Sequence, residues 1–350
     1  GADVERIVVD AADGDGLAEL AGSTKVVVST VGPYEKYGSP LVAAVAAVGT
    51  DYCDLTGEVQ WMRRMIDAHQ HDAAVSGARI VHTCGFDSIP SDVGVWFTQQ
   101  RAIESLGEPC ERIAMRVEAM RGGVSGGTVD SMFTMVEQAA KDKDLRSLLA
   151  DPYALAPVDM RFGPQEPDVT RPVRDDATGE WLAPFVMAGV NTRVVHRTNA
   201  LLGRPWGPDF RYSESMATGA GPLGAIKAGG IVGGLGLTMA LSAMGPTRNL
   251  LKKVAPKPGE GPSPQAQAAG HWDVRFRGTT AGGKTIDTRV TGDRDPGYGS
   301  TAKMLGESAA ALVELDPAKV GGGFWTPASA FGDALVERLE AHAGLRFDVV

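Results

Sequence analysis

The stretch Val26-Val-Val-Ser-Thr-Val-Gly-Pro-Tyr34 decides the fold class of this chain. It begins with an apolar run of strand length, which predicts a strand buried on both faces, as in a parallel sheet. The run passes through the small polar residues Ser29 and Thr30 and turns sharply at Gly32-Pro33. Such a turn at the end of a strand leaves the backbone open to a ligand. Tyr34 would stand beside that ligand, and the alternative is an ordinary turn with Tyr34 packed on the domain surface.

Strands and helices alternate on both sides of this stretch. Short runs of β-branched or other apolar residues predict four strands, at 6–10, 25–31, 51–55 and 79–84. Helices are predicted between them at 17–21, 39–48 and 59–76, and the last two stop before a glycine. Four strands with three intervening helices predict a Rossmann-like, doubly wound parallel sheet, which is an α/β fold.

Two further strands of this sheet end in turns of the same kind. One is Asp51-Tyr-Cys-Asp-Leu-Thr-Gly-Glu58 and the other is Cys84-Gly-Phe-Asp-Ser-Ile-Pro-Ser-Asp92. Ligands of a doubly wound sheet bind beyond the carboxyl ends of its strands, so three glycine-containing polar turns at one edge predict a binding crevice. We expect Tyr34 to be the first candidate there for a proton or hydrogen-bond donor, and Asp87 the second.

The alternation changes after Trp96, which predicts a second domain with a mixed sheet. A strand is predicted at 111–120, a glycine-rich loop at 122–127 and a helix at 128–150. Residues 151–180 are rich in Pro, Asp and Arg and are expected to form a long surface excursion. Further strands are expected at 194–196, 210–213 and 272–277, a linker at 256–264, and closing helices at 307–315 and 327–342.

Residues 228–247 form an apolar, glycine-rich segment without a charged residue. Arg248, Lys252, Lys253 and Lys257 follow it, so one interpretation is a helix that touches a membrane with basic flanks. The other is a buried or substrate-covering helix, in which the glycines permit close packing. We favour the second, because each glycine weakens a helix by about 1 kcal/mol relative to alanine.

Charge and cysteine content exclude several classes of protein. The net charge of −9 argues against nucleic acid as the main partner, because phosphate binding needs a basic face. The three cysteines show no CxxC spacing, and His69 and His71 face different sides of a predicted helix, so no metal site is expected. Few cysteines also favour a reducing cytoplasm. The apolar segment leaves membrane association open.

The three turns also carry a family resemblance. V-G-P-Y at 31–34, D-L-T-G-E at 54–58 and G-F-D-S-I-P-S-D at 85–92 resemble the strand-end motifs of saccharopine dehydrogenase-like oxidoreductases. Later motifs are similar to the actinobacterial branch, which includes the trans-acting enoyl reductases of polyketide and long-chain lipid synthesis. These motifs are G-G-T at 126–128, N-T-R at 191–193, F-R-Y-S-E at 210–214, P-K-P-G-x-G-P at 256–262, G-Y-G-S-T-A at 297–302 and T-P-A-x-A-x-G-D at 326–333.

The resemblance implies an oxidoreductase that uses NADPH or NADH. Residues 1–95 would be the C-terminal part of a Rossmann domain, 96–300 a second α/β domain for the substrate, and 301–350 closing helices that return to the first domain. The implied substrate is a polyketide or long-chain acyl thioester, on a carrier protein, with a conjugated carbon–carbon double bond. Tyr34 and Asp87 would be catalytic, and the expected cofactor-binding residues are Thr30, Val31, Gly32, Pro33, Thr56, Gly57 and Gly85.

This sequence departs from the family pattern in one respect. Family members open with a strand, a G-x-x-G-x-x-G turn and a helix that cradles the pyrophosphate, and no such turn precedes Val26. We therefore expect the first βαβ unit to be missing from this sequence. Two alternatives stay open: an imine or carbonyl reductase of the same fold, and a non-catalytic, lipid-associated protein. A homodimer stays open as well.

Overall fold

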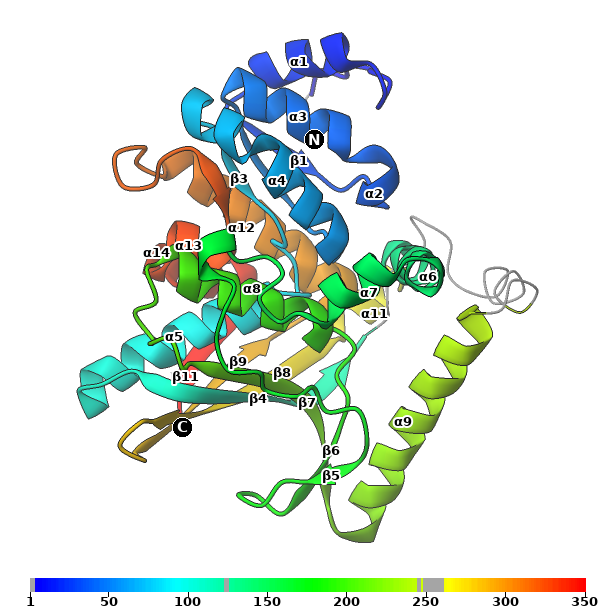
Figure 1. Ribbon diagram of the computed structural model, residues 1–350, viewed down its shortest axis with the longest axis vertical. Coiled ribbons are helices and arrows are strands. Elements are labelled where there is room, and N and C mark those ends of the chain that lie inside the picture. Colours follow the sequence, from blue (N-terminus) through cyan, green and yellow to red (C-terminus); the bar gives the residue numbers. More distant parts are fainter. Residues whose placement is uncertain (1–3, 123–125, 244–246, 248–260) are drawn as a thin grey trace.

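Two sheets organise the chain in the computed structural model, which describes residues 4–122, 126–243, 247 and 261–350 (Figure 1). Sheet A has four strands in the order β1-β2-β3-β10, and sheet B has seven in the order β11-β9-β8-β4-β7-β6-β5. Every pairing in sheet A is parallel. Sheet B pairs β4 with β7 in parallel and its other neighbours antiparallel. The α/β class, with a parallel sheet and a second, mixed sheet, is therefore confirmed.

Sheet A is built from short strands separated by helices. Its strands are β1 (Val26–Ser29), β2 (Asp51–Asp54), β3 (Arg79–Val81) and β10 (Gly323–Trp325). Helix α1 (Gly14–Gly22) precedes β1, and the helices that follow β1, β2 and β3 are α2 (Tyr34–Tyr37), α3 (Ser39–Val48), α4 (Val59–Ser76) and α5 (Ile89–Leu106). Helices α3 and α4 end where predicted, because Gly49 (φ 90°) and Gly77 (φ 89°) adopt the left-handed conformation that stops a helix.

The fourth strand of sheet A is not the one predicted. Residues 6–10 form no strand, and Val8 in that run is 98% exposed. A β-branched run becomes a strand only when it packs against a neighbouring strand and a core, and these residues have neither. The fourth position is taken by β10, which pairs with β3 and comes from the C-terminal part of the chain.

Sheet B holds the longer strands. They are β4 (Cys110–Arg121), β5 (Val173–Arg174), β6 (Glu180–Ala183), β7 (Arg211–Ala220), β8 (His271–Thr280), β9 (Thr285–Gly292) and β11 (Leu345–Val349). Buried and more exposed residues alternate along β8 and β9, so one face of the sheet packs on the core. Helix α5 lies against β8 and β9 and thereby joins the two sheets.

The remaining helices follow β4 in the chain. They are α6 (Gly126–Lys141), α7 (Lys143–Ala150), α8 (Ala188–Leu201), α9 (Gly221–Ala243), α11 (Pro264–Ala268), α12 (Thr301–Glu314), α13 (Pro327–Phe331) and α14 (Asp333–Arg338). Short 3₁₀ or π turns occupy Val158–Met160, Pro296–Ser300 and Leu339–Ala343. The single helix predicted at 128–150 is two helices, because Asp142 caps the start of α7 with its side chain.

The strand predicted at 194–196 is wrong, since these residues lie inside α8. Nearly all of α8 is buried, so its apolar run shows no exposed positions that would reveal a helical period. Residues 151–180 are also more than a surface excursion, because Tyr153, Ala154, Leu155 and Ala156 are buried. The guanidinium of Arg197 donates to the carbonyl oxygens of Leu155 and Phe324, which fastens this segment to β10.

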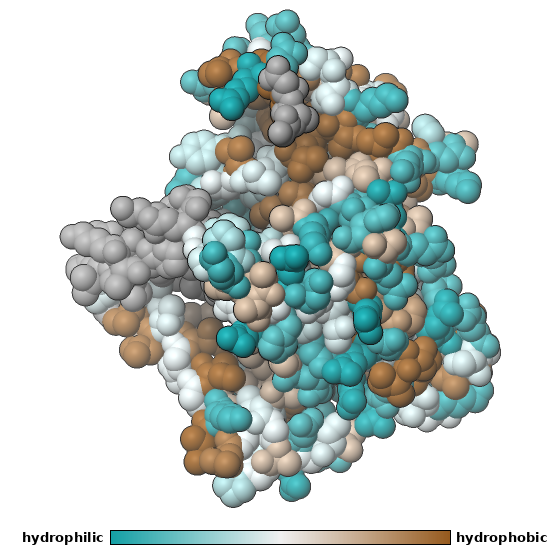
Figure 2. Space-filling model, turned by 180° about the vertical axis from the view of Figure 1, so that it is seen from behind, coloured by the Kyte–Doolittle hydropathy of each residue, from teal (hydrophilic) through white to brown (hydrophobic). Residues whose placement is uncertain are grey.

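The apolar segment forms α9, and most of this helix is exposed (Figures 1 and 2). A methyl group added at Gly229, Gly230, Gly233, Gly234 or Gly236 would meet no atom within 4 Å apart from the helix itself. The interpretation as a closely packed, buried helix is therefore wrong. By length and composition α9 could cross a membrane, and it is the one such helix in the described part of the chain. The basic flank and most of the predicted linker, at 248–260, lie outside the described residues.

Residues 301–350 contribute to both sheets. Helix α12 packs on β1 and β2, β10 completes sheet A, and β11 pairs with β9 at the edge of sheet B. The helices expected at 307–315 and 327–342 are present as α12 and as α13 with α14. The boundaries at residues 95 and 300 stay a prediction.

Candidate functional site

A cavity of about 650 Å³ lies at the carboxyl ends of β1, β2 and β3. Its wall includes the turns after these strands, two side chains of α6, and parts of α8 and α12 with the segments before them. Most of the lining is apolar, with Val28, Leu55, Met135, Val186, Met187, Val190 and Leu305 among the contributors. The predicted crevice at this edge of the sheet is therefore a real cavity.

Five of the predicted site residues line the cavity and four do not. The lining residues are Thr30, Gly32, Tyr34, Gly57 and Asp87. The others are Val31, Pro33, Thr56 and Gly85, which stand within two residues of a lining residue in the same turns. A methyl group on Gly85 would lie 3.1 Å from Cγ2 of Thr301, so this glycine permits close packing.

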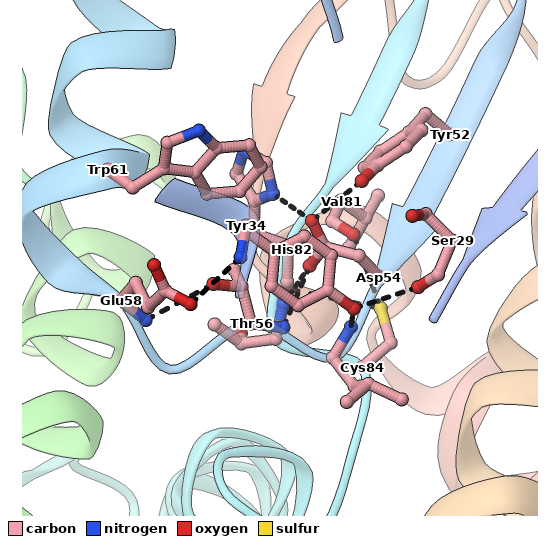
Figure 3. Close-up of polar contacts among 12 residues, drawn as sticks. Ser29, Tyr34, Tyr52, Asp54, Thr56, Glu58, Trp61, Val81, His82 and Cys84 are labelled. Carbon is pink, nitrogen blue, oxygen red and sulfur yellow. Dashed lines mark hydrogen bonds and ion pairs between the residues drawn. The ribbon is translucent and has the colours of Figure 1, made fainter. Parts of the chain in front are cut away.

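Tyr34 is buried, and its hydroxyl has a structural partner (Figure 3). The hydroxyl donates to the carbonyl oxygen of Ser29 at 2.9 Å and accepts from the Leu55 amide at 3.4 Å. Burial and the nearby Asp54 raise the pKa of Tyr34 well above its usual value. The phenol thus bridges the ends of β1 and β2 and holds its proton tightly. Its catalytic role stays a prediction, which this geometry does not favour.

Glu58 fixes the turn that carries Tyr34. Its carboxylate accepts hydrogen bonds from the main-chain nitrogens of Tyr34 at 2.9 Å and Glu35 at 2.8 Å, at the start of α2. It also accepts from the Ser131 hydroxyl of α6 at 2.8 Å. Burial raises the pKa of Glu58. One carboxylate therefore joins the first strand-end turn to the helix above the cavity.

A second buried carboxylate, Asp54, holds the other two turns (Figure 3). Its Oδ1 accepts from the Thr56 and Thr83 amides at 3.1 and 3.2 Å, and its Oδ2 lies 2.8 Å from Nδ1 of His82. The Tyr52 hydroxyl donates to the same Oδ2 at 3.0 Å. The His82 ring packs beside the Trp61 ring, with ring centroids 5.1 Å apart. This network fixes the ends of β2 and β3.

Asp87 differs from the other acids of the site. It lines the cavity, and no donor in the described part of the chain bonds to its carboxylate. Burial raises the pKa of Asp87 to about 6. Its neighbours hold the turn in place: the Phe86 amide donates to the Thr301 hydroxyl at 3.0 Å, and the Ser88 hydroxyl donates to Asn191 at 2.9 Å. Asp87 is thus a positioned carboxyl group whose proton is available to a ligand.

The lining contains no lysine, arginine or histidine among the residues that the structure describes. Arg193 and His196 of α8 lie outside this lining and are buried. Arg193 donates to the Leu149 carbonyl at 2.7 Å. The His196 ring packs on the Tyr153 ring, with ring centroids 4.5 Å apart. Burial lowers the pKa of His196 to about 3. The described residues also hold no cluster of three or more His, Cys, Asp or Glu side chains suited to a metal ion.

Sequence reasoning missed several residues of the cavity. Ser131 and Met135 come from α6, and Tyr298 and Thr301 come from the G-Y-G-S-T-A motif at 297–302. That motif was the available signal, because it concentrates glycine and hydroxyl residues just before a helix. Its place beside the strand ends depends on the return of the chain after sheet B, which no local pattern indicates.

The strand-end turns fit the nicotinamide end of a dinucleotide. Gly32 and Gly57 leave the backbone accessible on the cavity wall, and a methyl group on Gly57 would point at Met187, 3.6 Å away on another wall. A side chain at Gly57 would therefore occupy the space between these walls. The position beyond the carboxyl ends of parallel strands is where doubly wound folds bind such cofactors.

Comparison with known proteins gives close relatives. The chain is 43% identical over 348 residues to a Mycobacterium tuberculosis protein provisionally named trans-acting enoyl reductase, covering 96% of this chain and 82% of the relative. It is 40% identical over 350 residues to the trans-acting enoyl reductase of Mycobacterium bovis, covering 97% and 83%. The corresponding Mycobacterium ulcerans protein is 41% identical over 345 residues, covering 95% and 82%. No family model matches the chain.

Solved structures are more distant. Saccharopine dehydrogenase (L-Glu forming) from Saccharomyces cerevisiae aligns with 98% of this chain and 89% of its own, at 11% identity and a TM-score of 0.48. An amine dehydrogenase from Mycobacterium smegmatis aligns with 89% and 78%, at 11% identity and a TM-score of 0.35. Membership therefore rests on the sequence relatives, which match nearly the whole chain at 40% identity or more. The chain belongs to the family of trans-acting enoyl reductases.

Proposed function

We propose that this protein reduces a carbon–carbon double bond conjugated to the carbonyl of a long-chain acyl or polyketide thioester. The observation that carries the proposal is Asp87, a partly buried carboxyl group with no hydrogen-bond partner among the described residues, in an apolar cavity at the strand ends. The cofactor would be NADPH, with NADH as the alternative. The sequence family and the doubly wound sheet support a nicotinamide cofactor.

The cofactor would lie against the first two strand-end turns. Thr30 and Gly32 follow β1 and Gly57 follows β2, and all three line the cavity. A reduced nicotinamide, when bound, supplies hydride to the β-carbon of the substrate. The protein's part is to hold the ring, exclude water and provide a proton. Glu58 and Asp54 keep the turns in place, since their carboxylates fix the main chain on both sides of the cavity.

Asp87 would protonate the α-carbon. A carboxyl group with a pKa of about 6 keeps its proton over a larger part of the neutral range than an ordinary aspartate. The raised pKa follows from burial, so closure of the cavity around a substrate would strengthen this effect. We assign the acid role to Asp87 ahead of Tyr34, because the Tyr34 hydroxyl already donates to the Ser29 carbonyl.

The walls of the cavity support an uncharged, extended substrate. Met135, Val186, Met187 and Val190 present apolar surface, which suits an acyl chain. A dicarboxylate substrate of the saccharopine type would need cationic side chains to pair with, and no described lining residue is cationic. For this reason we prefer enoyl reduction to the reduction of an imine or a carbonyl. A substrate delivered on the carrier domain of a partner synthase agrees with the name of the relatives.

A cytoplasmic location is part of the proposal. The three cysteines are free and buried, which is compatible with a reducing compartment. A homodimer remains a further proposal, to be tested by sedimentation.

The deciding experiment follows the absorbance of the reduced cofactor during single turnover. The purified protein is mixed with NADPH and an α,β-unsaturated acyl thioester on an acyl carrier protein, and the saturated thioester serves as the matched control. We expect rapid cofactor oxidation with the unsaturated substrate alone. Oxidation only with an α-keto acid and an amine would establish imine reduction instead. Cofactor binding without oxidation of any substrate would indicate a non-catalytic protein.

A further inference from the structure

Helix α9 carries an apolar stripe that is exposed to solvent, and one of its members, Gly230, stands at the edge of a groove beside sheet B. Its members are spaced by three and four residues, the spacing that places side chains on one face of a helix. All six are exposed, and Leu223, Ile226 and Leu237 are 74, 69 and 61% exposed. We call this set the outer stripe: Leu223, Ile226, Gly230, Gly233, Leu237 and Ala240.

The opposite face of α9 packs on the protein. Its members are buried or partly buried, and they are Gly224, Ala228, Ile231, Leu235 and Ser242. A helix on the surface of a protein in water normally turns a polar face outward. In α9 the outward face is as apolar as the inward one. Figure 2 shows hydrophobic surface on the part of the molecule that α9 forms. The outer stripe therefore exposes apolar side chains to water, although its composition suits an apolar environment.

The polar groups of α9 are satisfied within the helix. The Thr238 hydroxyl donates to the Gly234 carbonyl at 2.9 Å, and the Ser242 hydroxyl donates to the Thr238 carbonyl at 2.6 Å. Lys227 is the one charged residue of α9, and it lies in an open groove with Glu118 and Glu180 beside sheet B. The outer stripe can thus enter an apolar medium without leaving a hydrogen-bonding side chain unpaired.

We propose that the outer stripe of α9 docks the protein on the surface of an anionic phospholipid bilayer. The helix lies on the membrane and does not cross it. It connects β7 to the region before β8, and both strands pair with β4 in one sheet. A crossing helix would place β7 and β8 on opposite sides of the bilayer, which their shared partner forbids. The helix also contacts β6, β7 and α6 of the same protein.

Charge argues for an anionic membrane. From residue 215 to residue 259 the sequence holds five cationic residues and no acidic one, although the whole chain has a net charge of −9. The cations are Lys227, Arg248, Lys252, Lys253 and Lys257. An apolar helix with basic neighbours in sequence is the combination that binds anionic lipid, because headgroup attraction adds to the burial of apolar surface. This inference does not depend on the enoyl reductase proposal.

A second copy of the chain is the competing occupant. Glycines at four-residue spacing can pack two helices against each other. However, α9 contains no aromatic or arginine side chain, the types that anchor most protein interfaces. The test must therefore distinguish binding to vesicles from self-association.

The test is flotation of the full chain with vesicles of phosphatidylcholine, alone or with phosphatidylglycerol. The variant Ile226→Glu/Leu237→Glu changes two side chains of the outer stripe that are mostly exposed. The matched control is Val75→Glu, which alters a side chain that is 74% exposed on α4. We expect the wild type and Val75→Glu to float with anionic vesicles. The double variant should lose roughly ten-fold or more in vesicle affinity, and binding to neutral vesicles should be similarly weak.

Three results would overturn the docking of the outer stripe on a bilayer, and a fourth would overturn the choice of lipid. The first is absence of wild-type binding to anionic vesicles, and the second is equal binding by the double variant. The third is sedimentation of the wild type as a dimer without lipid that the double variant breaks, which would assign the stripe to a second copy. Equal binding to both vesicle types would refute the choice of anionic lipid. Near-ultraviolet circular dichroism of both variants checks that they retain the folded structure.

Discussion

The hydroxyl of Ser131 in α6 donates a hydrogen bond of 2.8 Å to the carboxylate of Glu58 at the start of α4. This bond joins helix α6, which follows β4 of sheet B, to the turn that follows β1, because the same carboxylate accepts the amides of Tyr34 and Glu35. Both Ser131 and Glu58 line the cavity. The position of α6 over the cavity and the shape of the first strand-end turn therefore depend on one acidic side chain.

Replacing Glu58 with glutamine should loosen this junction. The amide offers one oxygen to three donors and turns an N–H group toward one of them, so the free energy of unfolding should fall by about 1–3 kcal/mol. We also expect a higher KM for the thioester. Urea denaturation and steady-state kinetics measure both. Glu35→Gln is the control, since Glu35 pairs with the exposed Arg64 and should change stability by less than about 1 kcal/mol. Equal effects of the two changes would refute this role of Glu58.

Replacing Asp87 with asparagine should remove the proposed proton donor while keeping the shape of the turn. The catalytic rate should fall by about 10²–10⁴-fold, the usual contribution of a general acid. The affinity for NADPH should stay within about two-fold of the wild type, because Asp87 provides a proton rather than a cofactor contact in this proposal. Stopped-flow kinetics and fluorescence titration separate the two quantities. A variant with the wild-type rate would exclude Asp87 as the acid.

The pH dependence of the rate follows from the same residue. Burial raises the pKa of Asp87 to about 6 from an ordinary 3.8, so the carboxyl group is protonated below that pH and loses its proton above it. The proposed reaction needs the protonated form. The value of kcat/KM should therefore be high below pH 6 and fall as the pH rises through that point. Rates measured across this range should show one descending limb, and Asp87→Asn should lack it.

Replacing Tyr34 with phenylalanine tests the other candidate for the acid. Loss of the hydroxyl leaves the Ser29 carbonyl and the Leu55 amide without this partner, which should lower the free energy of unfolding by about 1–2 kcal/mol. We expect the catalytic rate to fall by less than about ten-fold. Thermal denaturation and kcat measurements decide the matter. A loss of three orders of magnitude at unchanged stability would restore Tyr34 as the catalytic residue.

Local signals predicted much of sheet A and of the edge that carries the cavity. Helices α3 and α4 were predicted with their final bounds, since Gly49 and Gly77 mark their ends in the sequence itself. The three strand-end turns were identifiable because glycine and acidic residues follow short apolar runs. Strand β10 was not, because three residues, Gly323–Trp325, carry no periodic pattern and become a strand only by pairing with β3.

Contacts between residues far apart in the sequence distinguish the two candidates for the proton donor, Tyr34 and Asp87. Tyr34 and Asp87 occupy equivalent places in the sequence, one after β1 and the other after β3. The structure gives the Tyr34 hydroxyl a partner in Ser29, whereas the carboxylate of Asp87 has none among the described residues. Sequence spacing places both residues at the sheet edge, but the direction of each side chain depends on packing across the fold.

The two buried acids of α5 and β7 should make stability depend on pH. Burial raises the pKa values of Asp92 and Glu214 to about 7, from 3.8 and 4.5. Between about pH 4 and pH 7 the folded protein then binds more protons than the unfolded chain, so the free energy of unfolding falls as the pH rises. The change should flatten above about pH 7. Urea denaturation at several pH values measures it.

The variant Glu214→Gln should reduce this pH dependence. The two oxygens of the Glu214 carboxylate accept from Tyr212 and Asn191 at 2.7 and 3.0 Å. Glutamine stays neutral, and its one oxygen can accept from Asn191 while its N–H group donates to the Tyr212 hydroxyl. The part of the slope that belongs to Glu214 should disappear, which corresponds to on the order of 3 kcal/mol between the two limits of pH. Glu337→Gln, at an exposed position of α14, is the control. An unchanged slope in Glu214→Gln would contradict the assignment.

The return of the chain to form β10 makes the folding of sheet A depend on the order of synthesis. Strand β3 ends at Val81, whereas its outer neighbour begins at Gly323. A ribosome adds roughly 5–20 residues per second, so the nascent chain carries β3 with an open edge for about 10–50 seconds. An open edge can pair with another nascent chain. The three-residue length of β3 limits this hazard, because so short an edge offers few hydrogen bonds to a wrong partner.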